Sequence, residues 1–233
     1  MTEGGTLLFV YEGCVFHLGD DVQVPKAGSR FLLRHLEVRE DDEVLDWGTG
    51  AGFAAVLAAR RAKRVVAIDI VPECVARARQ NALLNGVADR VDVRLGDGYA
   101  PARGETFDLI VSGAPQMPTP PEREREDWMA CADNGGVDGW AVLDKLIGGA
   151  RAHLKPGGRL VFSLFGFLGE RTARAKLEHA GLAAREVARE WQPFPRLGYE
   201  RLEHIRAHDV ERVLPGGIPR AVERLLLEGR RER

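Results

Sequence analysis

The stretch EVLDWGTGAGFAAVLAARRAKRVVAIDI, residues 43–70, joins two apolar runs through a glycine-rich turn and a helix-forming segment. Residues 43–48 and 64–70 have the length and composition of short buried strands. Between them, residues 53–62 carry Ala, Val and Leu on one side, as an amphipathic helix does. Strands that alternate with helices are typical of a parallel sheet with helices on both faces.

The same alternation continues along the chain. Further strands are predicted at 90–97, 107–112 and 159–165, and further helices at 72–86, 137–154 and 169–181. Pro72 begins the first of these helices and Gly86 ends it. Three other segments complete the prediction: a small hairpin at 13–25, a closing antiparallel strand pair at 183–190 and 199–207, and an amphipathic helix in the tail 219–233.

Composition limits the class of protein. The 233 residues carry a formal net charge of −2, so the chain has no general polycationic surface, and we expect no nucleic-acid partner. The N-terminus has no signal-peptide pattern, and no window approaches a membrane span, which predicts a soluble cytoplasmic protein without a membrane partner. Cys14, Cys74 and Cys131 are too far apart for a zinc site, so no metal is expected. The abundance of Ala, Arg and Gly favours a bacterial source.

The turn between the first strand and the first helix has the spacing of a ligand-binding loop. Gly48, Gly50 and Gly52 let the backbone approach a ligand and leave the helix N-terminus open. The pattern is G-x-G-x-G rather than the G-x-G-x-x-G of dinucleotide loops, because Phe53 stands where the third glycine would fall. Asp46 would repel a pyrophosphate and attract an ammonium group.

Three carboxylates follow three successive strands. Asp46 suits an amino-acid ammonium, Asp69 suits the two hydroxyls of a ribose, and Asp97 suits an adenine edge. Together they indicate S-adenosylmethionine (SAM), with S-adenosylhomocysteine as the product. The predicted cofactor-binding residues are Asp46, Gly48, Thr49, Gly50, Gly52, Asp69, Ile70, Asp97, Gly98 and Ser112.

As a set, the segments LDWGTGAG, AIDI, RLGDG, FDLIVS and HLKPGGRLVF resemble the class I SAM-dependent methyltransferases over residues 20–206. The resemblance implies an α/β fold: one Rossmann-like domain with a mostly parallel seven-stranded sheet and an antiparallel last strand. We divide the chain into an N-terminal hairpin and entrance helix (1–36), the SAM-binding domain (37–208) and a C-terminal helical extension (209–233). Trp47 departs from the pattern and is expected to narrow the methionine end of the pocket.

The flanks are similar to the HemK-type glutamine N5-methyltransferases. The segment YEGCVFHLGDDVQVPKAGSRFLL (11–33) matches their entrance segment, with Ser29 and Arg30 in place of Thr-Glu. The segment DNGGVDG (133–139) matches a glycine-rich turn before a helix, in which Asp138 is placed to cap that helix.

The resemblance fails at the acceptor motif. In the family, the fourth strand ends in Asn-Pro-Pro-Tyr, whose Asn side chain and first proline carbonyl accept the two hydrogens of a planar substrate nitrogen. Here the sequence is Gly113-Ala114-Pro115-Gln116. The remaining positioning candidates are the Ala114 carbonyl and the Gln116 amide, and the predicted substrate-side residues are Gly113, Trp128, Asp138 and Phe167.

Without the family's amide acceptor, the sequence favours a small-molecule acceptor with an intrinsically nucleophilic N, O or C atom, because such an atom needs positioning alone. A HemK-like protein (glutamine) N-methyltransferase with a rebuilt motif is the alternative, which makes a protein substrate possible. A SAM-binding protein that does not methylate, whether an enzyme of other chemistry or a regulatory subunit, is the third hypothesis.

Overall fold

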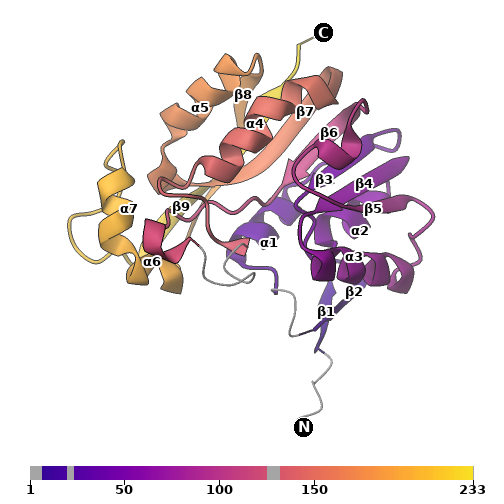
Figure 1. Ribbon diagram of the computed structural model, residues 1–233, viewed down its shortest axis with the longest axis horizontal. Coiled ribbons are helices and arrows are strands. Elements are labelled where there is room, and N and C mark those ends of the chain that lie inside the picture. Colours follow the sequence, from indigo (N-terminus) through magenta and orange to yellow (C-terminus); the bar gives the residue numbers. More distant parts are fainter. Residues whose placement is uncertain (1–6, 20–23, 125–131, 233) are drawn as a thin grey trace.

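The computed structural model describes residues 7–19, 24–124 and 132–232, and its centre is a seven-stranded sheet (Figure 1). The strand order is β5-β4-β3-β6-β7-β9-β8. The strands are β1 Leu7–Tyr11, β2 Cys14–Leu18, β3 Glu43–Trp47, β4 Arg64–Asp69, β5 Val91–Leu95, β6 Phe107–Ser112, β7 Leu154–Phe165, β8 Ala183–Pro193 and β9 Ala221–Arg230. The α-helices are α1 Ala27–Arg34, α2 Phe53–Ala59, α3 Pro72–Leu84, α4 Ala141–His153, α5 Glu170–His179, α6 Arg196–Glu200 and α7 Leu202–His208.

Five neighbouring strands of the sheet are parallel, and β9 runs antiparallel between β7 and β8. The predicted α/β class, the seven strands and the antiparallel last strand are therefore confirmed. Because the strands from β5 to β7 point the same way, their carboxyl ends meet at one edge of the sheet. Ligands of open parallel sheets bind at that edge.

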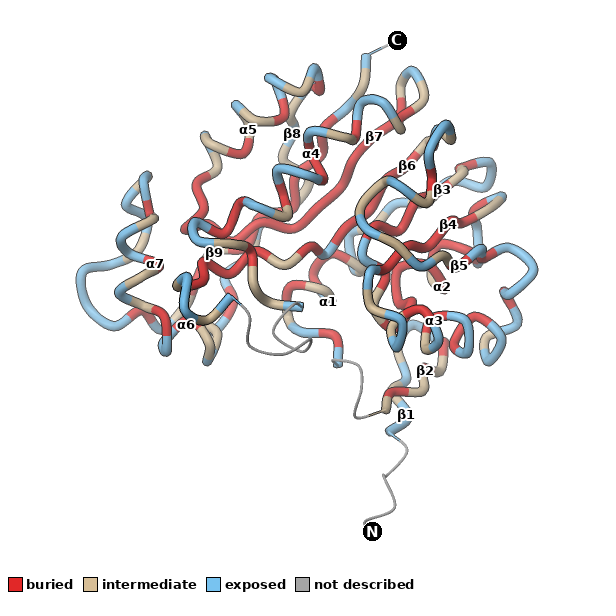
Figure 2. The backbone as a smooth tube through the Cα atoms, in the orientation of Figure 1, coloured by how far each residue is buried: buried red, intermediate tan, exposed pale blue. Residues whose placement is uncertain are grey.

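Each face of the sheet packs against its own apolar cluster. One cluster joins the sheet to α4 and α5, and the other joins it to α1, α2, α3 and the N-terminal hairpin. The strands in the middle of the fold are buried along most of their length (Figure 2). Side chains alternate between the two faces, so that Val44 enters one cluster and Leu45 the other.

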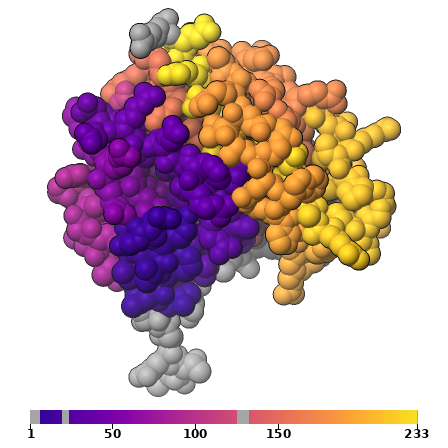
Figure 3. Space-filling model, turned by 180° about the vertical axis from the view of Figure 1, so that it is seen from behind, coloured from indigo at the N-terminus to yellow at the C-terminus, as the bar shows by residue number. Residues whose placement is uncertain are grey.

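The N-terminal hairpin is present, but it lies earlier in the chain than the predicted 13–25. Strands β1 and β2 pair from Leu7–Leu18 to Tyr11–Cys14, and the turn at Glu12 and Gly13 has positive φ angles of 49° and 74°. Asn81 of α3 and its C-cap residue Asn85 bind the backbone of β2 at His17 and Val15, respectively. From behind, the indigo hairpin lies against the purple first half of the domain (Figure 3).

The prediction of a C-terminal helix was wrong. Residues 221–230 form β9, which lies inside the sheet and pairs with both β7 and β8. The three consecutive leucines 225–227 are completely buried, because a strand in the middle of a sheet is covered on both faces. Residues 209–233 are therefore not a helical extension, and the SAM-binding domain does not end at residue 208.

The predicted strand at 199–207 was wrong as well. These residues lie in the short helices α6 and α7, and β8 takes β9 as its antiparallel neighbour instead. In the YERLEHIRA segment Arg201 and Ile205 are buried, and a spacing of four residues places both on one face of a helix.

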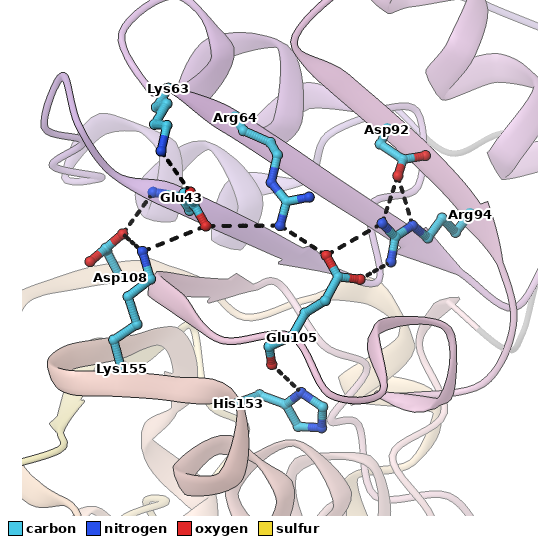
Figure 4. A network of polar contacts seen from close by, with 9 residues as sticks. All are labelled: Glu43, Lys63, Arg64, Asp92, Arg94, Glu105, Asp108, His153 and Lys155. Carbon is cyan, nitrogen blue, oxygen red and sulfur yellow. Dashed lines mark hydrogen bonds and ion pairs between the residues drawn. The ribbon is translucent and has the colours of Figure 1, made fainter.

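A network of charged side chains ties the strands together at the opposite edge of the sheet, near the starts of β3, β4 and β6 (Figure 4). Glu43 bonds to Lys63 at 3.0 Å and lies 3.5 Å from Lys155, which bonds to Asp108 at 2.8 Å. Glu105 pairs with Arg94 and with Arg64. Most members of this network lie at strand starts, and Arg94 reaches it from the later part of β5. None of its residues lines the ligand cavity, so its role is structural.

Candidate active site

A cavity of about 660 Å³ opens at the carboxyl edge of the sheet. It is lined by the ends of β3 and β4, by residues that follow β5 and β6, by the first turn of α1 and by the start of α4. Of the predicted cofactor residues, the cavity is lined by Asp46, Gly48, Thr49, Gly50, Asp69, Ile70, Asp97 and Gly98. Its size suits a ligand of the dimensions of a nucleoside with an amino-acid arm.

The three glycines of the loop have different tasks. All have positive φ angles, 78° for Gly48, 54° for Gly50 and 83° for Gly52. A Cβ atom at Gly48 or Gly50 would meet nothing within 4 Å, so these two leave open space in the cavity. A Cβ atom at Gly52 would lie 3.1 Å from Ala78 Cα, so Gly52 instead lets α2 pack against α3.

Asp46 is a buried carboxylate at the end of β3. The Thr49 hydroxyl and the Ala55 backbone N–H both donate to Oδ2, at 2.6 and 3.0 Å. Among the described residues no donor is bound to Oδ1. Burial raises the pKa of Asp46 to about 6, and Asp69 nearby adds to the effect. Asp46 thus lacks a counter-charge that a cationic ligand would supply.

Asp69 and Asp97 continue the acidic lining. Asp69 Oδ2 accepts a hydrogen bond from the Gly50 N–H at 2.8 Å, so this carboxylate also fixes the glycine loop. Burial raises the pKa of Asp69. Asp97 stands at the exposed rim, 3.4 Å from Lys145 of α4. Beside them, Ile70 presents an exposed apolar side chain to the cavity.

Trp47 lines the cavity, and its ring lies beside Gly98, a residue predicted to border the adenine, rather than at the methionine end where it was expected. Its ring is 3.7 Å from the Cβ position of Gly98, and its centroid is 6.0 Å from that of Tyr99. The Ser112 hydroxyl is completely buried and donates to the Trp47 carbonyl at 2.8 Å, so Ser112 braces β6 against β3 and does not line the cavity.

The two predicted positioning groups are joined to each other and not to the cavity. The Gln116 amide nitrogen donates to the Ser163 carbonyl at 2.8 Å and to the Ala114 carbonyl at 3.2 Å. Its Oε1 accepts from the Phe165 N–H at 2.7 Å. Both residues are buried, and neither lines the cavity. The structure therefore gives Gln116 a structural role, since both ends of its amide hold the loop to β7.

The glycine-rich segment 133–139 packs around this loop. A Cβ atom at Gly135 would lie 2.5 Å from Gln116 Cα, and one at Gly139 would lie 2.7 Å from the Gln116 carbonyl oxygen. Asp138 accepts a hydrogen bond from the Trp140 N–H at 2.9 Å, which forms a turn just before α4 rather than a cap on it. Asp138 does not line the cavity.

Of the other substrate-side predictions, Gly113 lines the cavity and Phe167 does not. Phe167 is 1% exposed and stacks on Phe165 with ring centroids 4.7 Å apart, so it belongs to the core. Trp128 lies outside the described residues.

Three further residues that line the cavity were not predicted as site residues from the sequence. They are Lys26, the N-cap residue of α1, Ser29 of α1, and Asn134. With Gly113 and Pro115 they define the acceptor side of the cavity. Lys26 bonds to Asp133 at 2.5 Å, which links the first turn of α1 to the 133–139 segment. The sequence carried one signal for these three residues, because they lie in the segments 11–33 and 133–139, which resemble the HemK-type family.

The cavity fits SAM on its own chemistry. A buried carboxylate, Asp46, has one oxygen without a protein donor, as an ammonium site requires. Asp69, a second carboxylate, lies at the end of the next strand, and an apolar residue, Ile70, adjoins it. No group of three potential metal-ligating side chains was found in the described parts of the chain, and no helix found there is long and apolar enough to cross a membrane.

Comparison with known proteins agrees with this geometry. Residues 22–127 match the family model described as "Methyltransferase small domain". The chain is 30% identical over 192 residues to a protein of Methanocaldococcus jannaschii provisionally named a protein N5-glutamine methyltransferase, covering 82% of this chain and 96% of that one. It is 34% identical over 203 residues to the release factor glutamine methyltransferase of Cereibacter sphaeroides, covering 83% of this chain and 71% of that one.

Among solved structures, Trm5 of Methanocaldococcus jannaschii in complex with adenosine matches with a TM-score of 0.64 at 15% identity. The match covers 99% of this chain and 57% of that one. At this identity the likeness concerns the fold alone.

Proposed function

Because the chain belongs to the HemK-type family of class I SAM-dependent methyltransferases, we propose that it methylates the side-chain amide nitrogen of a glutamine in a partner protein. The observation that carries this proposal is the extent of the match to a relative named for that reaction, which reaches 96% of the relative's length. The relatives favour a protein substrate over the small-molecule acceptor expected from the sequence.

The cofactor brings the reacting methyl group on a positively charged sulfur, which makes the methyl carbon electrophilic. The chain's part is to bind and orient. In this proposal Asp46 holds the ammonium group, Asp69 accepts from the ribose hydroxyls, and Asp97 with Gly98 borders the adenine. The acidic lining supports this assignment, because it complements a cationic ligand.

The acceptor nitrogen would lie at the end of β6. Gly113 has no side chain, so it contributes backbone atoms to the cavity, and Pro115 lies beside it. The Ala114 carbonyl already accepts a hydrogen bond from Gln116. The amide group of the substrate would therefore be positioned by backbone groups and by the walls formed by Ser29 and Asn134, with proximity supplying much of the rate.

A small-molecule acceptor remains a second candidate because of one observation. None of the residues 113–116 offers a side-chain hydrogen-bonding group to the cavity, since Gly113, Ala114 and Pro115 have none and the Gln116 amide is bound to the backbone. An amine or a carboxylate, which carries an available lone pair, needs no such group. An amide nitrogen needs one, because its lone pair is delocalised.

The test is to incubate the purified protein with methyl-labelled SAM and a size-fractionated extract of its host. Label in a protein, mapped to a glutamine by peptide sequencing, is the expected result. Label confined to the small-molecule fraction would replace the proposal by the second candidate. The Asp46→Ala variant is the negative control, because it removes the carboxylate assigned to the cofactor and keeps the acceptor side intact.

A further inference from the structure

Arg224 is a buried cation without a carboxylate partner. It lies in β9 opposite Phe165 of β7 and is 6% exposed. Its guanidinium carbon lies 3.3 Å from the centre of the Phe165 ring. No hydrogen bond or ion pair joins the guanidinium group to any residue of the described chain, and its Nε is shielded from solvent without a partner.

An unpaired buried charge is costly, and a cation–π contact offsets only part of that cost. Glu190, opposite Arg224 on β8, attracts Arg224 but is already bound, through Oε2 to Arg34 and through Oε1 to Gln192. Burial lowers the pKa of Arg224 to about 9. By contrast Arg159, which is equally buried, lies 2.9 Å from Asp42. In this fold, a buried arginine with a purely structural role is therefore paired with a carboxylate.

Arg224 lies against the first turn of α1, and it is not itself one of the residues that line the cavity. A Cβ atom at Gly28 would be 2.9 Å from both Cζ and Nη2 of Arg224, so the glycine makes room for the guanidinium. Lys26 and Ser29, on either side of Gly28, line the cavity. Phe165, on which the guanidinium rests, also binds Gln116 of the acceptor loop.

The first turn of α1 contributes the positive end of the helix dipole, while the charge of Lys26 is paired with Asp133. It contains no acidic side chain, and within the described residues no side chain caps its backbone N–H groups, which suits an anion. The guanidinium matches the planar geometry of a carboxylate better than any other side chain does.

We propose that Arg224 and the first turn of α1 bind a carboxylate of the methyl acceptor. The inference rests on the proposed function and deepens it: the substrate is a polypeptide with an aspartate or glutamate side chain close to the methylated glutamine. The bound carboxylate supplies the counter-charge that the fold withholds from Arg224, and it orients the substrate beside Gly113.

Carboxylate binding is measured without methyl transfer, by thermal unfolding of the protein saturated with S-adenosylhomocysteine. The probe is glutarate at constant ionic strength, with the neutral isostere glutaramide as its control. Glutarate is expected to raise Tm in a saturable way, by about 3–6 °C at ten times its Kd, and glutaramide to have no effect. No response to glutarate would overturn the proposal.

Two variants assign the response. Arg224→Met removes the charge at similar volume, and Gly28→Ala keeps the charge but displaces the guanidinium. Both are expected to abolish the glutarate shift and to keep the shift caused by S-adenosylhomocysteine. An unchanged glutarate shift in Arg224→Met would overturn the proposal.

Arg159→Met is the matched control for a structural arginine. It strands Asp42 in the core and is expected to lower Tm by about 6–20 °C, whereas Arg224→Met should leave Tm unchanged or raise it. An equal loss of Tm in both variants would show that Arg224 is structural. A larger shift with inorganic phosphate than with glutarate would also contradict an acidic side chain as the ligand.

The proposed function and the carboxylate site can be refuted independently of each other. If label from SAM enters only small molecules while glutarate still binds through Arg224, the carboxylate site stands and the polypeptide substrate does not. If label enters a protein and glutarate does not bind, the carboxylate site is refuted alone.

Discussion

The side chain of Gln116 is bonded to the backbone of Phe165, 49 residues further along the chain, at 2.7 Å. The same amide donates to the carbonyl of Ser163. These bonds fasten the acceptor loop to the end of β7, so the loop has a fixed shape. Within this loop, Gly113 and Pro115 line the cavity.

Replacing Gln116 by leucine is expected to lower the free energy of unfolding by about 2–4 kcal/mol, because it leaves the Phe165 N–H and the Ser163 carbonyl buried without partners. Urea unfolding followed by circular dichroism measures the loss. The control is Gln80→Leu on the exposed surface of α3, which should change stability by less than about 0.5 kcal/mol. Equal stability of the two variants would refute the structural role.

Gly113→Asn is expected to raise methyl incorporation into the protein substrate by up to about a hundredfold, since it restores a preorganised amide acceptor. The cavity accommodates the change, because a Cβ atom at Gly113 meets only Leu32, at 3.8 Å. Gly113→Leu, which fills similar space without an acceptor, is the control and should not raise the rate. A fall in labelling with Asn would indicate a site remade for another acceptor.

Lowering the pH is expected to weaken cofactor binding, because Asp46 becomes protonated. Its pKa is raised to about 6, so the carboxylate that attracts the ammonium is ionised at pH 7 and becomes protonated below pH 6. The affinity for S-adenosylhomocysteine should drop by up to about tenfold per pH unit below that value. Calorimetric titration at pH 7, 6 and 5 measures this dependence.

Two comparisons isolate Asp46 as the titrating group. Methylthioadenosine lacks the amino-acid arm, so its affinity should vary little over the same range. Asp46→Asn should bind S-adenosylhomocysteine weakly and without this pH dependence. A steep pH dependence that persists in Asp46→Asn would assign the titration to another group.

The charge network around Glu43 and Glu105 is expected to stabilise the fold at neutral pH and to lose this effect at acidic pH (Figure 4). A hydrogen bond from Lys63 lowers the pKa of Glu43, and one from Arg94 lowers the pKa of Glu105. A lowered pKa in the folded state means stability that is present above the unfolded value of about 4.5 and is lost as pH falls below it.

Thermal unfolding between pH 6 and pH 3 checks this expectation. Glu105→Gln should flatten the fall of Tm below pH 4.5, because the variant has one carboxylate fewer to protonate. The exposed Glu178→Gln serves as the control and should keep the slope of the parent protein. Identical slopes in both variants would exclude Glu105 as a contributor.

The first half of the fold could be predicted well because its signals are local. Strands β3, β4 and β6 are continuous apolar runs, and the turn after β3 needs glycines for its positive φ angles. The C-terminal part could not be predicted in the same way. The segment that forms β9 carries charges at Arg224 and Glu228, which gave it the spacing of an amphipathic helix.

By itself, the sequence determined the parallel sheet, the glycine loop and the three carboxylates at the strand ends, since strand propensity and backbone freedom depend on neighbouring residues. Only the tertiary structure decided what β9 and Gln116 do. Arg224 and Glu228 lie in an inner strand of the sheet, where Phe165 and Arg185 lie against them. The Gln116 amide reaches β7 rather than the substrate because the folded chain places Ser163 and Phe165 within hydrogen-bonding distance. Partners so far apart in sequence leave no local pattern.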